Sequence, residues 1–112
     1  MSPRGVPLTA AQRLARAVPE EQFMNDVMMY AQVICGWKLI YHVADSRRVS
    51  SAGFPDLVMV RNGRLLFLEL KKVGGVLSSA QRAWLFELGK VPGIEVMVAT
   101  PEDWPALEAK LR

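Results

Sequence analysis

Residues 56–71 read Asp-Leu-Val-Met-Val-Arg-Asn-Gly-Arg-Leu-Leu-Phe-Leu-Glu-Leu-Lys, and this stretch decides the fold. Asn62-Gly63 separates two apolar runs. Asn-Gly in that setting is the strongest short-range signal of a β-hairpin, because a two-residue type I′ turn needs positive φ at both central residues. Counting outward from this turn along both strands places Asp56 opposite Glu69. Directly opposed residues share one face of a sheet, with Cβ atoms about 4.5–5.5 Å apart.

Lys71 follows Glu69 by two residues and lies on the same face, because strand side chains alternate. Opposed like charges are destabilising, and a cation between Asp56 and Glu69 would remove that repulsion. Mg²⁺ suits such a pair, since it binds one or two carboxylates and keeps waters or substrate phosphates. The neighbouring ammonium can stabilise phosphoryl charge or help to activate a water. The alternative is an ordinary Glu69–Lys71 ion pair, with Asp56 a turn residue after Pro55. The Pro-Asp sequence, the register and the flanking elements favour the metal site.

Length and composition favour one globular domain, with 112 residues of which 51% are hydrophobic. No stretch approaches the roughly 18 uninterrupted apolar residues of a membrane span. The single cysteine, Cys35, excludes an internal disulfide framework and a cysteine-based zinc site. We expect it to be a small buried hydrophobe. His42, the single histidine, cannot form a multi-histidine metal site. It is either a core or surface residue or a helper near phosphate.

Charge is concentrated at the start of the chain. Residues 1–19 contain three arginines and no acidic residue, which accounts for the whole net charge of +3. Such an arm can contact a phosphate backbone, and it also resembles an organellar transit segment. The simplest interpretation is a solvated helix over residues 10–18, capped by Thr9 and ended before Pro19. We therefore separate a basic N-terminal arm, 1–19, from a single domain, 20–112.

The hydrophobic pattern predicts the other elements. These are an amphipathic helix over 20–35, a strand over 37–43, a helix from Ser78 or Ser79 to about Leu88, a strand over 94–100, and a short C-terminal helix from Thr100 or Pro101. A strand reached through a crossover helix runs parallel to a neighbour. Hairpin strands that are apolar on both faces belong in the middle of a sheet covered on each side. The expected fold is α/β, with a mixed sheet and helices on both faces.

Three motifs on this order of elements resemble the PD-(D/E)xK nuclease superfamily, and most of all its small VRR-NUC branch. They are Gly53-Phe54-Pro55-Asp56, Glu69-Leu70-Lys71 and Leu77-Ser78-Ser79-Ala80-Gln81. The similarity extends from about Glu20 to Trp104. It implies a restriction-endonuclease-like αβββαβ core.

The resemblance also implies a site. Asp56 and Glu69 would hold Mg²⁺ or Mn²⁺, with the Leu70 backbone carbonyl as a third protein ligand. Lys71 would orient or activate the attacking water and stabilise the pentacovalent phosphate. Gln81 would project from the second helix to the edge of the site, unless it is simply an amide on the helix surface.

The family also places a carboxylate on the first helix, and Glu20 is our choice as a catalytic residue and candidate metal ligand. Glu20, Phe23 and Val27 lie at helical spacing, which turns Glu20 toward the sheet. Glu21 is the second candidate. A solvated glutamate that complements the helix dipole is the alternative for either.

Arg47 and Arg48 are similar to a basic pair of this branch that would grip backbone phosphate; otherwise they are exposed loop cations. Arg82 and Lys38 could extend the basic track, although nothing in the sequence decides that. Lys72 points to the face opposite Lys71 and is not counted as catalytic.

These features predict a metal-dependent nuclease that hydrolyses DNA phosphodiester bonds. Family analogy suggests a structure-selective endonuclease for four-way junctions or flaps, acting in repair or recombination as a homodimer. We expect an intracellular, nucleoid-associated protein of bacterial or phage type. One alternative is a non-catalytic nucleic-acid-binding subunit of a larger DNA-processing complex, which the intact Asp56, Glu69 and Lys71 argue against. The other is a small structural or adaptor protein in which these residues form an ion-pair cluster.

Overall fold

The computed structural model describes residues 7–43 and 52–112. Its elements, in chain order, are α1 (Ala10–Ala17), α2 (Glu20–Met29), the π-helical turn η1 (Tyr30–Ile34), β1 (Leu39–His42), β2 (Leu57–Arg61), β3 (Arg64–Leu70), α3 (Ser79–Gly89), β4 (Ile94–Ala99), the 3-10 turn η3 (Pro101–Asp103) and α4 (Trp104–Leu111). No helix among these residues is long and apolar enough to cross a membrane.

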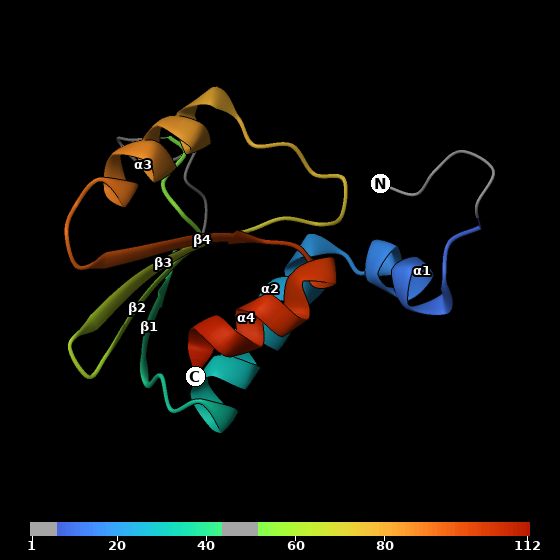
Figure 1. The fold of residues 1–112 in the computed structure, drawn as a ribbon, viewed down its shortest axis with the longest axis horizontal. Coiled ribbons are helices and arrows are strands. Elements are labelled where there is room, and N and C mark those ends of the chain that lie inside the picture. Colours follow the sequence, from blue (N-terminus) through green and yellow to red (C-terminus); the bar gives the residue numbers. More distant parts are fainter. Residues whose placement is uncertain (1–6, 44–51) are drawn as a thin grey trace.

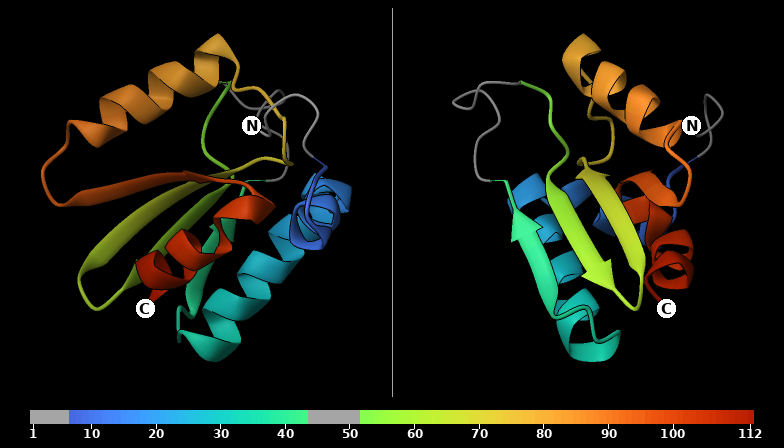
Figure 2. Two further views of the ribbon diagram at one scale, coloured as in Figure 1. Left: turned by 45° about the vertical axis from the view of Figure 1, so that its right-hand side comes forward. Right: turned by 90° about the vertical axis from the view of Figure 1, so that its left-hand side faces the viewer.

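The four strands form one mixed sheet in the order β1-β2-β3-β4. β1, β2 and β3 are antiparallel neighbours, and β4 runs parallel to β3 after the crossover helix α3. Helix α3 lies on one side of the sheet, while α2 and α4 lie on the other (Figures 1 and 2). The α/β class, the mixed sheet and the parallel last strand are therefore confirmed.

The β2–β3 hairpin has the register that its turn predicts. Asn62 and Gly63 both have positive φ, 47° and 76°, as a type I′ turn requires. The paired residues run from Arg61 opposite Arg64 to Leu57 opposite Leu68. One step beyond the last pair lie Asp56 and Glu69, at the end of the hairpin remote from the turn.

The sheet face toward α2 and α4 carries the core. Its central strands contribute fully buried apolar residues, and the two helices cover them with others: Leu57, Met59, Leu66, Leu68 and Leu70 from the sheet, and Phe23, Val27, Leu107 and Leu111 from the helices. The buried Trp37, just before β1, donates its indole N–H to the Leu111 carbonyl at 2.7 Å. This bond joins the start of the sheet to the end of α4.

Helices lie on both faces, as expected, but the face toward α3 is only half covered. Helix α3 connects β3 to β4 and therefore lies over that half, where it contacts β4. On β1 and β2 the same face leaves Leu39 68% exposed, Tyr41 67% and Val60 43%. We call these three residues the open apolar face.

Other differences are local. The predicted 20–35 helix ends in the π-helical turn η1, and β1 is shorter than the predicted strand. Cys35 is half-buried at the core margin rather than fully buried. Thr9 caps α1 as expected, and Ser78, rather than Ser79, caps α3.

Candidate metal centre

Asp56 is held by backbone contacts to the strands on either side of β2. Its carboxylate oxygen Oδ2 accepts a hydrogen bond from the Leu70 N–H at 2.8 Å, and its backbone carbonyl accepts one from the Val43 N–H at 2.9 Å. The N–H and C=O groups of one strand residue point to the same side, so the Leu70 carbonyl also faces Asp56. The Leu70 carbonyl is therefore on the side of the strand from which it could bind a metal together with Asp56.

Glu69 is almost completely buried, with a side-chain exposure of 1%. Its Oε2 accepts a hydrogen bond from Gln81 Nε2 at 3.1 Å and lies 3.6 Å from the Lys71 ammonium. Its Oε1 is buried and has no hydrogen-bond partner among the described residues. A buried oxygen without a partner is costly. A divalent cation bound between Glu69 and Asp56 would satisfy it, so the residues present fit the metal that the motif implies.

The electrostatics lead to the same conclusion. The pKa of Glu69 is raised from 4.5 to about 8: burial is the largest cause, the Asp56 charge adds to it, and the Lys71 ammonium opposes both effects. Burial also raises the pKa of Asp56, against the Leu70 N–H, which lowers it. Two ionised carboxylates are therefore unfavourable here unless a cation compensates them.

Helix α2 brings Glu20, rather than Glu21, into electrostatic contact with the pair. The charge of Glu20 raises the pKa of both Asp56 and Glu69. Within residues 7–43 and 52–112, however, no three acidic, histidine or cysteine side chains converge closely enough to hold an ion together. Glu20 thus acts on the site through its charge, and its role as a direct metal ligand stays a prediction.

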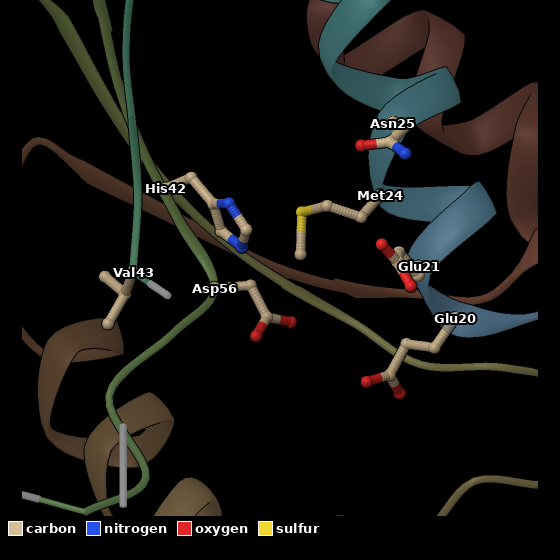
Figure 3. Close-up of a pocket in the computed structure, with 7 residues that line it drawn as sticks. All are labelled: Glu20, Glu21, Met24, Asn25, His42, Val43 and Asp56. Atoms are coloured by element: carbon tan, nitrogen blue, oxygen red, sulfur yellow. The ribbon is translucent and has the colours of Figure 1, made fainter. Parts of the chain in front are cut away.

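A cavity of about 330 Å³ lies between the start of α2, the end of β1 and Asp56. It is lined by Glu20, Glu21, Met24, Asn25, His42, Val43 and Asp56. Figure 3 shows the His42 imidazole directed from β1 into the space between Asp56 and α2. His42 pairs with Leu57, the residue after Asp56. The sequence could not predict this position of His42, because no short turn joins β1 to β2 and fixes their register.

Gln81 reaches the site because of the way α3 begins. Its side-chain oxygen accepts the Ser78 N–H at 2.8 Å in a capping box, which turns Nε2 toward Glu69. Gln81 is therefore not a free surface amide. One side chain both caps the helix and orients the buried carboxylate.

The candidate DNA-binding residues are not gathered in this way. Arg47 and Arg48 lie outside the described residues. Lys38 is at the end of β1 opposite His42, beside the open apolar face. Arg82 is exposed on the first turn of α3, where it donates to the Leu77 carbonyl at 3.1 Å. Their contacts with DNA stay predictions.

Comparison with known proteins agrees with this arrangement. The family model of the VRR-NUC domain matches residues 12–102. A solved structure described as a VRR_NUC domain protein superimposes with a TM-score of 0.64, covering 85% of this chain and 91% of its own, at 23% sequence identity. No curated protein matches the chain. The fold and the matched motifs define a nuclease-type domain of the PD-(D/E)xK superfamily. Within that superfamily, the chain belongs to the VRR-NUC family.

Proposed function

We propose that this protein is a Mg²⁺- or Mn²⁺-dependent endonuclease that cleaves DNA phosphodiester bonds. The observation that carries the proposal is the buried Oε1 of Glu69 beside Asp56, which has no hydrogen-bond partner within residues 7–43 and 52–112, with the Lys71 ammonium at the other oxygen of the same carboxylate. A structural ion-pair cluster would satisfy both oxygens of its buried glutamate. A metal site leaves one free for the ion.

A divalent ion held by Asp56 and Glu69 would supply positive charge to the scissile phosphate and to the attacking water. Two side chains of the protein would orient the groups that react. Gln81 keeps Glu69 in one orientation. Lys71, which is only 17% exposed, holds its ammonium 3.6 Å from Oε2 of Glu69, next to the proposed metal position, where it can orient a water and stabilise charge on the phosphate.

The cavity beside the pair is acidic, and this affects how DNA can approach. Glu20, Glu21 and Asp56 contribute three carboxylates to its lining, whereas His42 and Asn25 are its side-chain hydrogen-bond donors. The carboxylates would repel a phosphate next to the cleaved bond, whereas His42 and Asn25 could bind it. We propose that His42 donates to a non-bridging oxygen of the substrate strand.

We further propose that the substrate is branched DNA, either four-way junctions or flaps. The protein would act on it as a homodimer, in which two sites act on two strands. The open apolar face supports the dimer, because Leu39, Tyr41 and Val60 remain exposed on one side of the sheet. Light scattering should give twice the monomer mass. Tyr41→Glu should give the monomer, and a monomeric wild type would rule out the dimer.

The decisive experiment is cleavage of plasmid, flap and four-way-junction DNA with Mg²⁺ or Mn²⁺. Wild type should cleave, whereas Glu69→Ala and Lys71→Ala should not. Lys72→Ala is the matched control, because Lys72 is the exposed neighbour. Equal activity of Glu69→Ala and wild type would exclude this site. DNA binding by wild type without cleavage would instead indicate the non-catalytic subunit.

A further inference from the structure

Gly53 lies where no other residue fits. It is buried and has a φ of +88°, a conformation that L side chains rarely adopt. A Cβ at this position would lie 2.5 Å from the carbonyl carbon of Ala80 and 2.7 Å from the backbone nitrogen of Gln81. Both are main-chain atoms, so rotation of a side chain cannot relieve the overlap. The loop before Asp56 therefore touches the first turn of α3 directly.

The next residue strengthens the same contact. The Phe54 ring lies between Trp84 of α3 and Phe67 of β3, with centroid distances of 4.9 and 5.9 Å and edge-to-face angles of 79° and 80°. Aromatic pairs favour this geometry. Pro55, which follows, is fully buried. The segment that ends at Asp56 is thus packed between the sheet and α3.

Both carboxylates of the metal centre depend on this packing. The loop delivers Asp56, while the first turn of α3 delivers Gln81, which binds Glu69 at 3.1 Å. At Gly53, the loop that carries Asp56 contacts the helix turn that carries Gln81. A side chain there would move α3 away from the loop, which would lengthen the Gln81–Glu69 bond and leave Lys71 as the one remaining described partner of Glu69 Oε2.

We propose that Gly53 is a positioning residue of the metal centre: its missing side chain lets the Asp56 loop contact the first turn of α3, and this contact holds Gln81 on Glu69. The kinetic consequence rests on the proposed nuclease function. The structural consequence does not, because it concerns the environment of the Gln81 amide alone.

The chain supplies a matched control for the test. Gly93 has nearly the same backbone conformation, with a φ of +83°, but a Cβ there would meet no described atom within 4 Å. Gly53→Ala and Gly93→Ala therefore share the cost of a positive φ and differ in the clash. A small misplacement of catalytic groups can cost up to about a hundredfold in rate. At saturating Mn²⁺ and DNA, Gly53→Ala should lose at least about tenfold in kcat with little change in KM. Gly93→Ala should stay within about twofold of wild type.

A second measurement needs no activity. In ¹⁵N-labelled protein, the Gln81 side-chain NH₂ resonance should shift in Gly53→Ala and stay in place in Gly93→Ala. If wild type neither binds Mn²⁺ nor cleaves DNA, the proposed function fails, while this readout still decides the role of Gly53. An unchanged Gln81 resonance in Gly53→Ala would overturn the positioning role.

Two further variants complete the design. If Gly53→Ala does not fold, Ala80→Val adds bulk at the same contact from α3, without strain at Gly53, and should shift the Gln81 resonance in the same way. In the Gln81→Ala background, Gly53→Ala should cost much less of kcat than it does in wild type, because both act through Glu69. Independent losses in this double-mutant cycle would show that Gly53 acts by another route.

Discussion

Gln81 donates its side-chain amide to the buried carboxylate of Glu69 at 3.1 Å while its oxygen accepts the backbone N–H of Ser78. The orientation of the amide is thus determined by the start of α3. Because the oxygen is already used by the cap, the NH₂ group must face Glu69. The two hydrogen bonds of one side chain therefore connect the cap of α3 to the orientation of the buried Glu69 carboxylate.

Gln81→Glu should separate these two roles. The new carboxylate can still accept the Ser78 N–H, so the cap should be kept, while its charge beside Glu69 should lower the melting temperature. It cannot donate to Glu69, and we expect cleavage to fall by roughly tenfold or more, since a hydrogen bond to a charged group contributes about 1.5–3 kcal/mol. Gln12→Glu is the matched control, because Gln12 has the same capping-box position in α1. Equal activity losses in both variants would contradict a specific role for Gln81.

Without metal, the protein should become less stable as pH rises from about 4.5 to about 8. Glu69 has its pKa raised to about 8 in the folded state, against 4.5 when unfolded. Between those values the folded state binds more protons than the unfolded state, so the free energy of unfolding falls with increasing pH. Urea unfolding in EDTA across this range measures the slope. Glu69→Gln should reduce it, and an unchanged slope would show that Glu69 is not the group that titrates.

Metal binding should have the opposite pH dependence. The ion requires Glu69 and Asp56 to be ionised, and both have raised pKa values, so the affinity for Mn²⁺ should increase as pH approaches 8. Binding at neutral pH should release protons, which calorimetry in buffers of different ionisation enthalpy detects. Mn²⁺ should also raise the melting temperature of wild type and not that of Asp56→Ala. Proton-neutral binding at pH 7 would argue that the ion binds elsewhere.

His42→Ala should weaken the use of DNA without removing the metal. The loss of a donor to phosphate in the acidic cavity should reduce kcat/KM by about tenfold. His42→Gln, which keeps a donor, should recover part of that loss. Mn²⁺ affinity should be unchanged in both variants. If His42→Ala cleaves DNA as wild type does, His42 has no contact with the substrate.

The predicted parts of the site and the unpredicted ones differ in how locally they are determined. The register that brings Asp56 beside Glu69, one step beyond the last pair, followed from the sequence because a two-residue turn sets the register of both strands. The position of His42 did not, because a long segment separates β1 from β2 and register across such a connection is not set by turn geometry. The contact of Gly53 with α3 was equally inaccessible, since sequence shows that a glycine is present but not what lies against it.

The open apolar face is a feature of the fold that the sequence did not predict. Alternation along β2 and β3 showed that both faces were apolar, and from that we expected both to be covered. Which half a single crossover helix covers depends on its length and on the strands it joins. Helix α3 has 11 residues and joins β3 to β4, so Leu39 and Tyr41 stay exposed. Hydrophobicity indicates that a surface is suited to burial, and topology decides whether burial occurs within the chain.

The Asn62-Gly63 turn sets the positions of Asp56 and Glu69, the two carboxylates of the candidate metal centre. Each acid is reached by counting equal numbers of residues away from that turn, so their meeting depends on strand length as well as on side-chain chemistry. A substitution in the turn would weaken the hairpin and leave the count intact. One inserted residue would be worse, because a shift of one position moves a strand's side chains to the opposite face. A change in length at the turn would therefore displace the two acids at the opposite end of the hairpin.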